Sequence, residues 1–349
     1  MIADAMTQRL TAEARFGAGN AAEIVKTMNV RALAVLSGIF LTVIPSVALA
    51  SEADRWLERM VKALRAENYS GVFTYVRGSE IDSIRIVHRV EGDQEHERFV
   101  YLNGEPRELY RSGGRSECMA PRGSDGCAQS LTVGPFARTF PEELVLNRTL
   151  YEVRVGGTGR VADRRARRLE IRPRLSDRYG HELWLDEATG LLLQSVLING
   201  NDVLEVFQFS EVTVGTNLPP SALASTLPAD ASRSVLAEAL PNGGVADEGG
   251  RDHMSLASTY EPTWIPEGFM QIRVQSRDNH LSYSDGLATF SLFVETASVA
   301  ELPDLVTRVG GTVMVTQKLS GGGGQVTLVG ELPAVTAKRV ADSVLRRVP

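Results

Sequence analysis

The residues that could carry chemistry are few, and none of them forms a complete catalytic group. His181 and Glu182 begin a pattern like the zinc-protease motif H-E-x-x-H, but position 185 is leucine and the segment reads as a strand, whereas that motif needs a helix. His88 and His96 lie among acidic residues that could hold a divalent metal weakly, but an exposed hairpin tip is the better interpretation. We therefore expect no metal site.

Two further patterns lack the context that their chemistry requires. The glycine-rich segment 156–159 has no strand-to-helix setting of the kind that a phosphate-binding loop needs, and no G-x-S-x-G nucleophile motif occurs. An enzyme needs a nucleophile, a base and an orienting group that converge. No such set is apparent, so we expect a protein that works by binding, without a cofactor, rather than an enzyme.

The chain has two cysteines, Cys118 and Cys127, which are nine positions apart. In an oxidising compartment such a pair most simply forms one structural disulfide, worth about 2–3 kcal/mol by the chain-entropy model. A redox or metal-binding pair is the weaker alternative, because the spacing is not C-x-x-C and no histidine lies near.

An export signal is the clearest feature near the start of the sequence. Residues 28–50 have a basic start at Arg31, an apolar core and small residues at the end, which is the pattern of a secretory signal peptide cleaved before Ser51. Residues 1–27 fit no such pattern, so we expect translation to start at Met28. The residue after the cleavage site is serine, so the cysteine acceptor of a bacterial lipoprotein anchor is missing. We expect a soluble periplasmic protein.

Composition and charge exclude two classes of protein. The 349 residues are 43% hydrophobic and 23% charged, which excludes global disorder and allows two domains. The net charge is −6, and the basic stripe that nucleic-acid binding requires is missing. The arginines between 160 and 178 alternate with strand residues. We interpret them as a solvated sheet face, with a site for phosphates or acidic groups as the alternative.

The remaining patterns predict an α+β protein with two domains. Residues 51–215 begin with an amphipathic helix at about 54–67 and continue in short strands joined by turns, which predicts one large antiparallel sheet. Residues 216–259 are rich in proline, glycine, alanine, serine and aspartate, and we expect a flexible linker. Residues 260–349 are predicted to form a smaller domain of strands, an aromatic-rich turn and a closing helix at about 334–345.

The strands near residues 191–209 are apolar on both of their faces. Leu191, Leu192 and Leu193 are consecutive, and Phe207 and Phe209 lie nearby. Because successive side chains of a strand point to opposite faces, both faces of these strands need burial. One face can pack on a helix, so the other needs a second layer, a partner or an apolar ligand.

Motifs of both predicted domains occur in a specific order. In the large domain they are DRWL at 54–57, NYSG at 68–71, GRVADR at 159–164, YGHELWLD at 179–186 and TGL at 189–191. In the small domain they are PTWIPEGF at 262–269, YSDGL at 283–287, VGELP at 329–333 and TAKR at 336–339. Together, behind a signal peptide, they resemble the RseB/MucB family of periplasmic regulators of envelope-stress sigma factors.

This resemblance implies a large domain similar to LolA and LolB, which is an unclosed barrel wrapped around helices, followed by a small α/β domain. It also implies that the chain binds the periplasmic part of a single-span anti-sigma factor of the RseA/MucA type and shields it from the site-1 protease DegS. Lipid or lipopolysaccharide signals are then expected to release the partner. An unclosed barrel agrees with strands that are apolar on two faces.

We expect the anti-sigma segment to contact aromatic residues and acyl chains to enter the large domain. The expected partner contacts are Tyr260, Trp264, Phe269 and Tyr283. The expected lipid contacts are Phe73, Tyr75, Leu102, Leu183, Leu193, Val196 and Phe207. Each of these residues could instead be plain core. The competing function is a periplasmic carrier of lipids or lipoproteins, and a homo-oligomer stays open.

Overall fold

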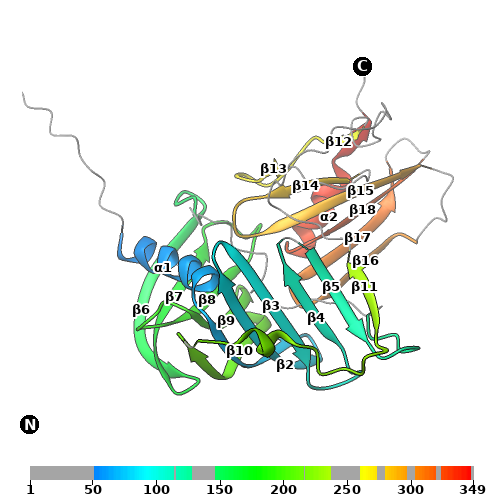
Figure 1. Ribbon diagram of the computed structural model, residues 1–349. Coiled ribbons are helices and arrows are strands. Elements are labelled where there is room, and N and C mark those ends of the chain that lie inside the picture. Colours follow the sequence, from blue (N-terminus) through cyan, green and yellow to red (C-terminus); the bar gives the residue numbers. More distant parts are fainter. Residues whose placement is uncertain are drawn as a thin grey trace, which may run out of the picture. The chain divides into compact units, whose positions relative to one another are not determined.

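A single helix begins the described part of the chain in this computed structural model (Figure 1). The structure describes residues 51–113, 115–127, 146–215, 217–236, 260–272, 280–296, 303–319 and 324–346. Helix α1 (Glu52–Ala66) begins at Ser51, whose hydroxyl accepts the Asp54 N–H at 3.1 Å, while the Asp54 carboxylate accepts the Ser51 N–H at 3.1 Å. Leu57 and Met60 are buried on its inner face, as the predicted amphipathic pattern requires.

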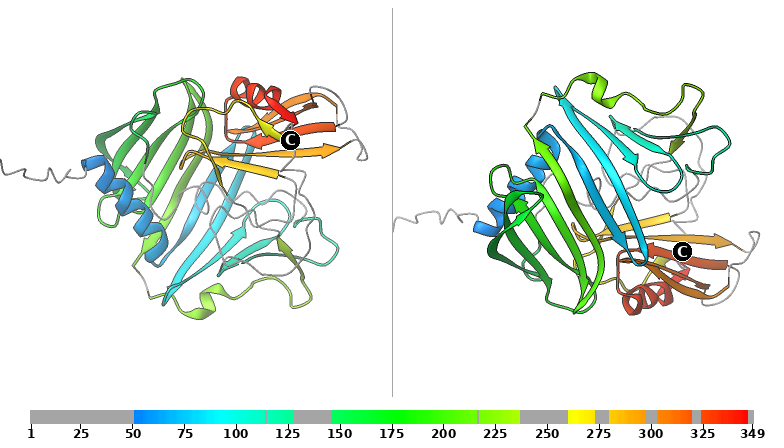
Figure 2. Two further views of the ribbon diagram at one scale, coloured as in Figure 1. Left: turned by 90° about the horizontal axis from the view of Figure 1, so that it is seen from above. Right: turned by 90° about the horizontal axis from the view of Figure 1, so that it is seen from below.

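Eleven antiparallel strands form one large sheet, in the order β11-β5-β4-β3-β2-β1-β10-β9-β8-β7-β6. The strands are β1 (Tyr69–Arg77), β2 (Glu80–Glu91), β3 (Gln94–Tyr101), β4 (Glu108–Ser112), β5 (Arg115–Ala120), β6 (Tyr151–Val161), β7 (Arg164–Pro173), β8 (Gly180–Asp186), β9 (Leu192–Asn199), β10 (Asp202–Val214) and β11 (Ser232–Leu236). The end strands β6 and β11 do not pair with each other, so the sheet is unclosed. It curves around α1 (Figure 2).

A second sheet of six strands forms the smaller part, in the order β13-β14-β15-β18-β17-β16. Its strands are β13 (Met270–Ile272), β14 (His280–Ser284), β15 (Thr289–Thr296), β16 (Leu305–Val309), β17 (Thr312–Lys318) and β18 (Gly324–Gly330). Helix α2 (Ala334–Asp342) packs on β17 and β18 through buried Ala337 and Val340. The short strands β12 (Tyr260–Pro262) and β19 (Val344–Arg346) pair separately. The predicted α+β class, with a large unclosed sheet and a smaller domain, is confirmed.

The segment expected to be a flexible linker differs from that expectation over residues 217–236. It forms the short 3-10 helix η2 (Pro220–Leu223), and β11 then adds to the edge of β5. Thr226 holds the segment in place, since its N–H and hydroxyl both donate to the buried Glu108 carboxylate, at 3.0 and 2.6 Å. Burial alone would raise the pKa of Glu108, but hydrogen bonds from Arg98, Thr226 and Tyr110 lower it to about 2. The polar composition of this segment therefore did not reveal that residues 217–236 pack against the large sheet.

The disulfide expected between Cys118 and Cys127 is present, with the Cα atoms 5.8 Å apart. It ties the buried centre of β5 to the loop that follows. The predicted signal peptide, the start at Met28 and linker residues 237–259 lie outside the described residues. In the part of the chain that the structure describes, no helix combines the length and apolar character needed to span a bilayer.

Candidate functional site

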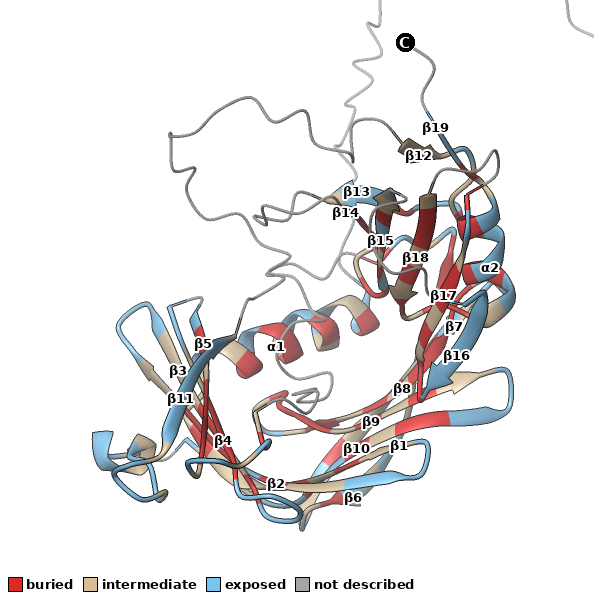
Figure 3. Cartoon of the chain, turned by 90° about the vertical axis from the view of Figure 1, so that its right-hand side faces the viewer, coloured by how far each residue is buried: buried red, intermediate tan, exposed pale blue. Residues whose placement is uncertain are grey.

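The concave side of the large sheet is filled by α1 and by five of the seven predicted lipid contacts. Phe73, Tyr75, Leu183, Leu193 and Phe207 are at most 5% exposed and share one buried cluster with the inner face of α1. The rings of Phe73 and Phe207 lie 4.8 Å apart. Figure 3 shows the buried face of the helix turned toward the sheet. These side chains are therefore core in this structure, and a lipid could reach them only if α1 or the core moved.

The other two predicted lipid contacts lie elsewhere. Leu102 follows β3 and is 43% exposed. Val196 is partly buried and, by the alternation of β9, points to the face of the sheet opposite Leu193. The structure therefore does not bring all seven residues together.

A cavity of about 430 Å³ lies elsewhere in the large sheet, between β1, β10 and the turn from β6 to β7. Its lining includes Arg85, Ser210, Glu211 and Thr213 beside Val72, Ala162 and Val212, so it is of mixed polarity. None of the seven predicted lipid contacts lines this cavity. An acyl chain therefore finds no ready apolar site there.

Two of the four predicted partner contacts belong to the core of the small sheet. Phe269 and Tyr283 are 4% and 6% exposed, and both pack on the ring of Phe290, at 5.2 and 5.0 Å between centroids. Trp264 and Tyr260 are only partly buried and lie at the border of that core. The guanidinium of Arg339 lies 3.8 Å from the centre of the Trp264 ring. Trp264 and Tyr260 can thus reach a partner more readily than the other two.

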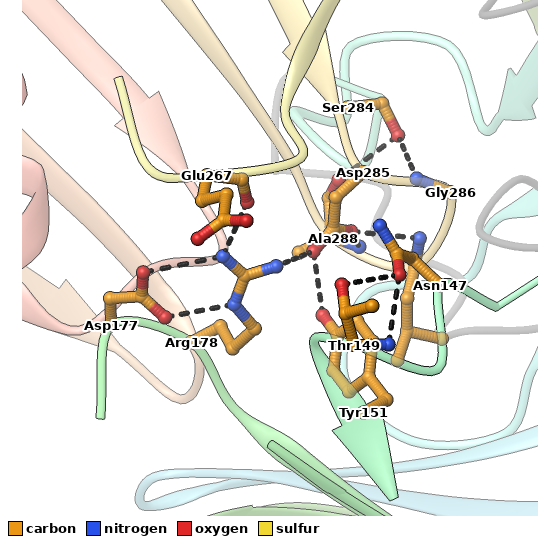
Figure 4. A network of polar contacts seen from close by, with 11 residues as sticks. Asn147, Thr149, Tyr151, Asp177, Arg178, Glu267, Ser284, Asp285, Gly286 and Ala288 are labelled. Atoms are coloured by element: carbon orange, nitrogen blue, oxygen red, sulfur yellow. Dashed lines mark hydrogen bonds and ion pairs between the residues drawn. The ribbon is translucent and has the colours of Figure 1, made fainter. Parts of the chain in front are cut away.

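A buried polar network joins the two sheets, which lie within one compact unit of the chain, Leu49–Pro349 (Figure 4). Its centre is Arg178, which lies in the turn before β8 and is 1% exposed. Nη1 of Arg178 donates to Oδ2 of Asp285 at 2.7 Å, and Nη2 donates to the Glu267 carbonyl at 2.7 Å. Nε donates to Oδ1 of Asp177 at 2.8 Å. One arginine of the large sheet therefore holds two loops of the small sheet.

Asp285, at the turn between β14 and β15, receives donors from both sheets. Its Oδ2 also accepts the hydroxyl of Tyr151 at 2.7 Å, and its Oδ1 accepts the N–H groups of Leu287 and Ala288 at 3.0 and 2.9 Å. Leu287 is 1% exposed and belongs to the buried cluster of the large sheet. The turn is thus inserted into the other domain. Burial lowers the pKa of nearby His181 to about 4, although the Asp285 charge opposes this shift.

A second contact between the sheets surrounds Glu205 on β10, which is 8% exposed. Its carboxylate accepts the Gly311 N–H at 2.8 Å and the hydroxyl of Tyr75 through a short hydrogen bond. Gly311 lies in the turn from β16 to β17, where a Cβ atom would overlap a side chain of β9. The hydroxyl of Tyr179 donates to the Leu332 carbonyl at 2.6 Å beside this contact. Tyr75, a predicted lipid contact, is thus part of the junction.

Glu331 lies next to this second contact and is partly buried. Its N–H donates to the Thr289 carbonyl at 2.9 Å. Burial, together with the nearby charge of Glu205, raises the pKa of Glu331 to about 7. Two carboxylates therefore share the junction, and one of them titrates near neutral pH.

The arginine-rich face of the large sheet is matched by carboxylates. The pairs are Arg160–Asp163, Arg164–Asp186, Arg165–Glu187, Arg167–Glu187, Arg168–Glu170 and Arg172–Glu170. Because these charges are balanced at the sheet surface, the structure favours a solvated face over an anion site. Sequence analysis did not identify Arg178 as a junction residue, and its place among the other arginines gave no signal of that role.

The fold and its buried junction define a two-domain α+β protein, and comparisons with known proteins identify its family. The family model "MucB/RseB N-terminal domain" matches residues 52–227, and "MucB/RseB C-terminal domain" matches residues 254–345. The chain belongs to the MucB/RseB family. The expected resemblance is thus confirmed over both domains.

Two curated relatives match nearly their whole length. The chain is 33% identical over 329 residues to "Sigma factor AlgU regulatory protein MucB" of Pseudomonas aeruginosa, which covers 91% of this chain and 98% of that protein. It is 27% identical over 311 residues to "Sigma-E factor regulatory protein RseB" of Haemophilus influenzae, covering 86% and 93%. The solved "complex structure of Pseudomonas aeruginosa MucA/MucB" has a TM-score of 0.66 and 33% identity, and covers 86% of this chain and 100% of that chain.

Proposed function

We propose that this chain is a periplasmic regulatory protein that binds the periplasmic domain of a transmembrane anti-sigma factor and protects it from site-1 proteolysis. One observation carries the proposal: the similarity to MucB extends over both sheets, with 33% identity across 98% of that relative. A MucB structure that resembles this chain, with a TM-score of 0.65, is described as "in complex with MucA(peri)". Similarity over both domains supports a shared binding role more strongly than similarity over one.

The junction supports a role in binding, because it holds the two sheets in one arrangement. A partner that contacts both sheets then loses little free energy to ordering them. Arg178 and Glu205 both serve this junction through buried hydrogen bonds. We propose that Trp264 and Tyr260 contact the partner directly, while Phe269 and Tyr283 support them from the core.

We further propose that acyl chains of lipid or lipopolysaccharide release the partner. The five buried aromatic and leucine residues beneath α1 share one apolar cluster with that helix, so an acyl chain would bind there only in an arrangement with α1 displaced. Release then follows from linkage, because the lipid favours an arrangement that binds the partner weakly. The loss of partner affinity cannot exceed the preference of the lipid for that arrangement.

A binding experiment with the periplasmic domain of a MucA-type anti-sigma factor tests the proposal. Calorimetry of the two purified proteins should show a defined stoichiometry, and the complex should resist cleavage by a DegS-type protease. The double variant Trp264→Ser/Tyr260→Ser should weaken binding, whereas Val335→Ser, at an 84% exposed position of α2, should not. Failure to bind, with the chain correctly folded, overturns the regulator proposal.

The lipid step has its own measurement. Lipopolysaccharide added to the preformed complex should lower the affinity for the anti-sigma domain, while a delipidated polysaccharide should not. If the chain instead transfers an acylated protein to an acceptor membrane and ignores the anti-sigma domain, the alternative function as a lipid or lipoprotein carrier replaces this one.

A further inference from the structure

The cavity of about 430 Å³ at β1, β10 and the turn from β6 to β7 has no part in the proposed function. Its lining carries one guanidinium, from Arg85, and two carboxylates, from Asp163 and Glu211. Hydroxyls and small apolar side chains complete it: Ser70, Val72, Ala162, Ser210, Val212 and Thr213. A cavity of this volume, with charges of both signs, has the size and the polar groups of a small-molecule site.

The register of three strands places Arg85 and Glu211 on either side of Val72. Val72 of β1 lies opposite Arg85 of β2 and also opposite Glu211 of β10. Because residues directly opposite each other point to the same face of a sheet, the guanidinium and the carboxylate extend from one face. Their Cα atoms are two strand spacings apart, which is about 10 Å. A cation and an anion therefore stand across a valine from each other.

Neither of these two charges is neutralised within the described part of the chain. Arg85 and Glu211 are exposed, and neither forms an ion pair with another described residue. The arginine-rich strand β7 differs, since its Arg164 and Arg168 are matched by carboxylates. Charged groups that are held apart over a cavity can each accept a ligand group of the opposite sign. The site therefore favours a ligand that carries both a carboxylate and a cation.

The backbone around the cavity departs from regular geometry at two places. The register of β1 and β10 shifts between Val72 and Phe73, so Ser210 has no opposite residue in β1. Such bulges redirect side chains and are frequent beside functional sites. Ala162 and Asp163 have φ of 48° and 59° and are the two non-glycine residues with positive φ among those described. This backbone region disfavours alanine, and departures of this kind gather at ligand sites.

We propose that this cavity binds a short zwitterionic peptide of two or three residues, with its C-terminal carboxylate on Arg85 and its N-terminal ammonium on Glu211. A peptide of this length spans roughly 7–10 Å, whereas a single amino acid is too short to contact both charges. The hydroxyls of the lining can form hydrogen bonds with its peptide groups. One guanidinium against two carboxylates disfavours a phosphorylated ligand. This proposal does not depend on the proposed function.

Titration of the ¹⁵N-labelled protein with trialanine, followed by amide chemical shifts, tests the site. We expect a dissociation constant of roughly 0.1–1 mM for a ligand of this size, with shifts centred on residues 70–72 and 210–213. N-acetyl-trialanine lacks the ammonium and trialanine amide lacks the carboxylate. Each should bind roughly tenfold or more weakly than trialanine, because each loses one charge-assisted contact. Alanine alone should bind more weakly still.

Variants assign the two ends of the peptide. Arg85→Gln and Glu211→Gln should each weaken trialanine binding by roughly tenfold or more. Arg85→Gln should then have little further effect on trialanine amide, and Glu211→Gln little further effect on N-acetyl-trialanine, because the group that each side chain binds is already missing. The matched control Arg115→Gln, at the exposed start of β5, should bind trialanine as the native chain does.

A variant that fills the cavity gives a second readout. Ser210→Trp leaves the charged residues in place and should abolish binding, and matching urea midpoints show that the fold is intact. The proposal is overturned if trialanine does not bind, if the capped peptides bind as tightly as trialanine, or if Arg85→Gln and Arg115→Gln bind it equally well. Chemical shifts confined to another part of the chain also overturn it.

Discussion

Replacement of Glu331 by glutamine should make the chain more stable at alkaline pH and reduce the pH dependence of its stability. Burial and the neighbouring Glu205 charge raise the pKa of Glu331 from 4.5 to about 7. The folded chain therefore binds this proton more tightly than the unfolded chain does. The stability that protonated Glu331 contributes is fully present at a pH below its pKa in the unfolded chain. This stability is lost as the pH rises through about 7.

The size of the expected change in stability follows from the shift in the pKa of Glu331. A rise from 4.5 to about 7 corresponds to about 3 kcal/mol at a pH above both values. Glu331 retains some contact with solvent, which screens its charge, so we expect about 1.5 kcal/mol. At about pH 8 the free energy of unfolding of the Glu331→Gln chain should exceed that of the native chain by this amount. The difference should shrink toward zero at about pH 5.

Urea unfolding of the two chains at several pH values measures this difference. Burial lowers the pKa of His181 to about 4, so acid destabilises the fold at that site. This pH dependence is opposite in sign to that of Glu331 and is present in both chains. The effect of Glu331 is therefore measured as the difference between the native and Glu331→Gln chains. The control Glu211→Gln removes an exposed carboxylate of β10 and should leave the pH profile unchanged. Equal pH slopes in the native and Glu331→Gln chains would refute the reasoning.

Three further changes test other parts of the fold by urea unfolding. Arg178→Met should lower stability by about 3–5 kcal/mol, because it leaves a buried carboxylate without its cation; a loss below 1 kcal/mol contradicts this. Gly268→Ala should cost about 2–4 kcal/mol, since φ is +83° and the new Cβ would overlap Leu150, whereas a neutral result excludes that contact. Replacing both Cys118 and Cys127 by serine should cost about 2–3 kcal/mol, and an unchanged midpoint would show that the disulfide adds no stability.

Local chemistry made the strands and turns predictable. The residue types of segment 186–190, DEATG, are typical of a turn, and there Asp186 accepts the N–H and hydroxyl of Thr189 at 2.9 and 2.7 Å. Two apolar runs separated by glycines are typical of a hairpin, and the strands formed by these runs, β17 and β18, pair with each other. Such features depend on residues close in sequence, so a single chain contains the information they need.

Contacts across strands were harder to predict, because they depend on register. The arginines of β7 were visible in the sequence, but the pairing of Arg168 with Glu182 and of Arg165 with Glu187 follows from where β7 and β8 align. Val196 was grouped with Leu193 as a lipid contact, yet the alternation of β9 places the two on opposite faces. Residue type alone could not assign a face.

The junction was the least predictable part. Arg178 and Asp285 are 107 positions apart, and each stands in a turn where a charged residue is ordinary. Trp264 and Phe269 of the aromatic-rich turn at 264–269 were both expected to contact the partner. In the folded chain its Phe269 lies 5.4 Å from the guanidinium of Arg178 and is buried. A motif that is typical of a family can therefore form contacts within the molecule rather than a surface for a partner.

The two junction contacts should respond differently to acid. Burial alone would lower the pKa of Arg178, but its hydrogen bond to Asp177 and the charge of Asp285 raise it, so this cation persists across the physiological range. At the second contact, the proton taken up by Glu331 removes its repulsion with Glu205 as the pH falls below about 7. Acid should therefore tighten the second contact while leaving the Arg178 cation in place. Mild acidification should therefore not separate the two sheets at this contact.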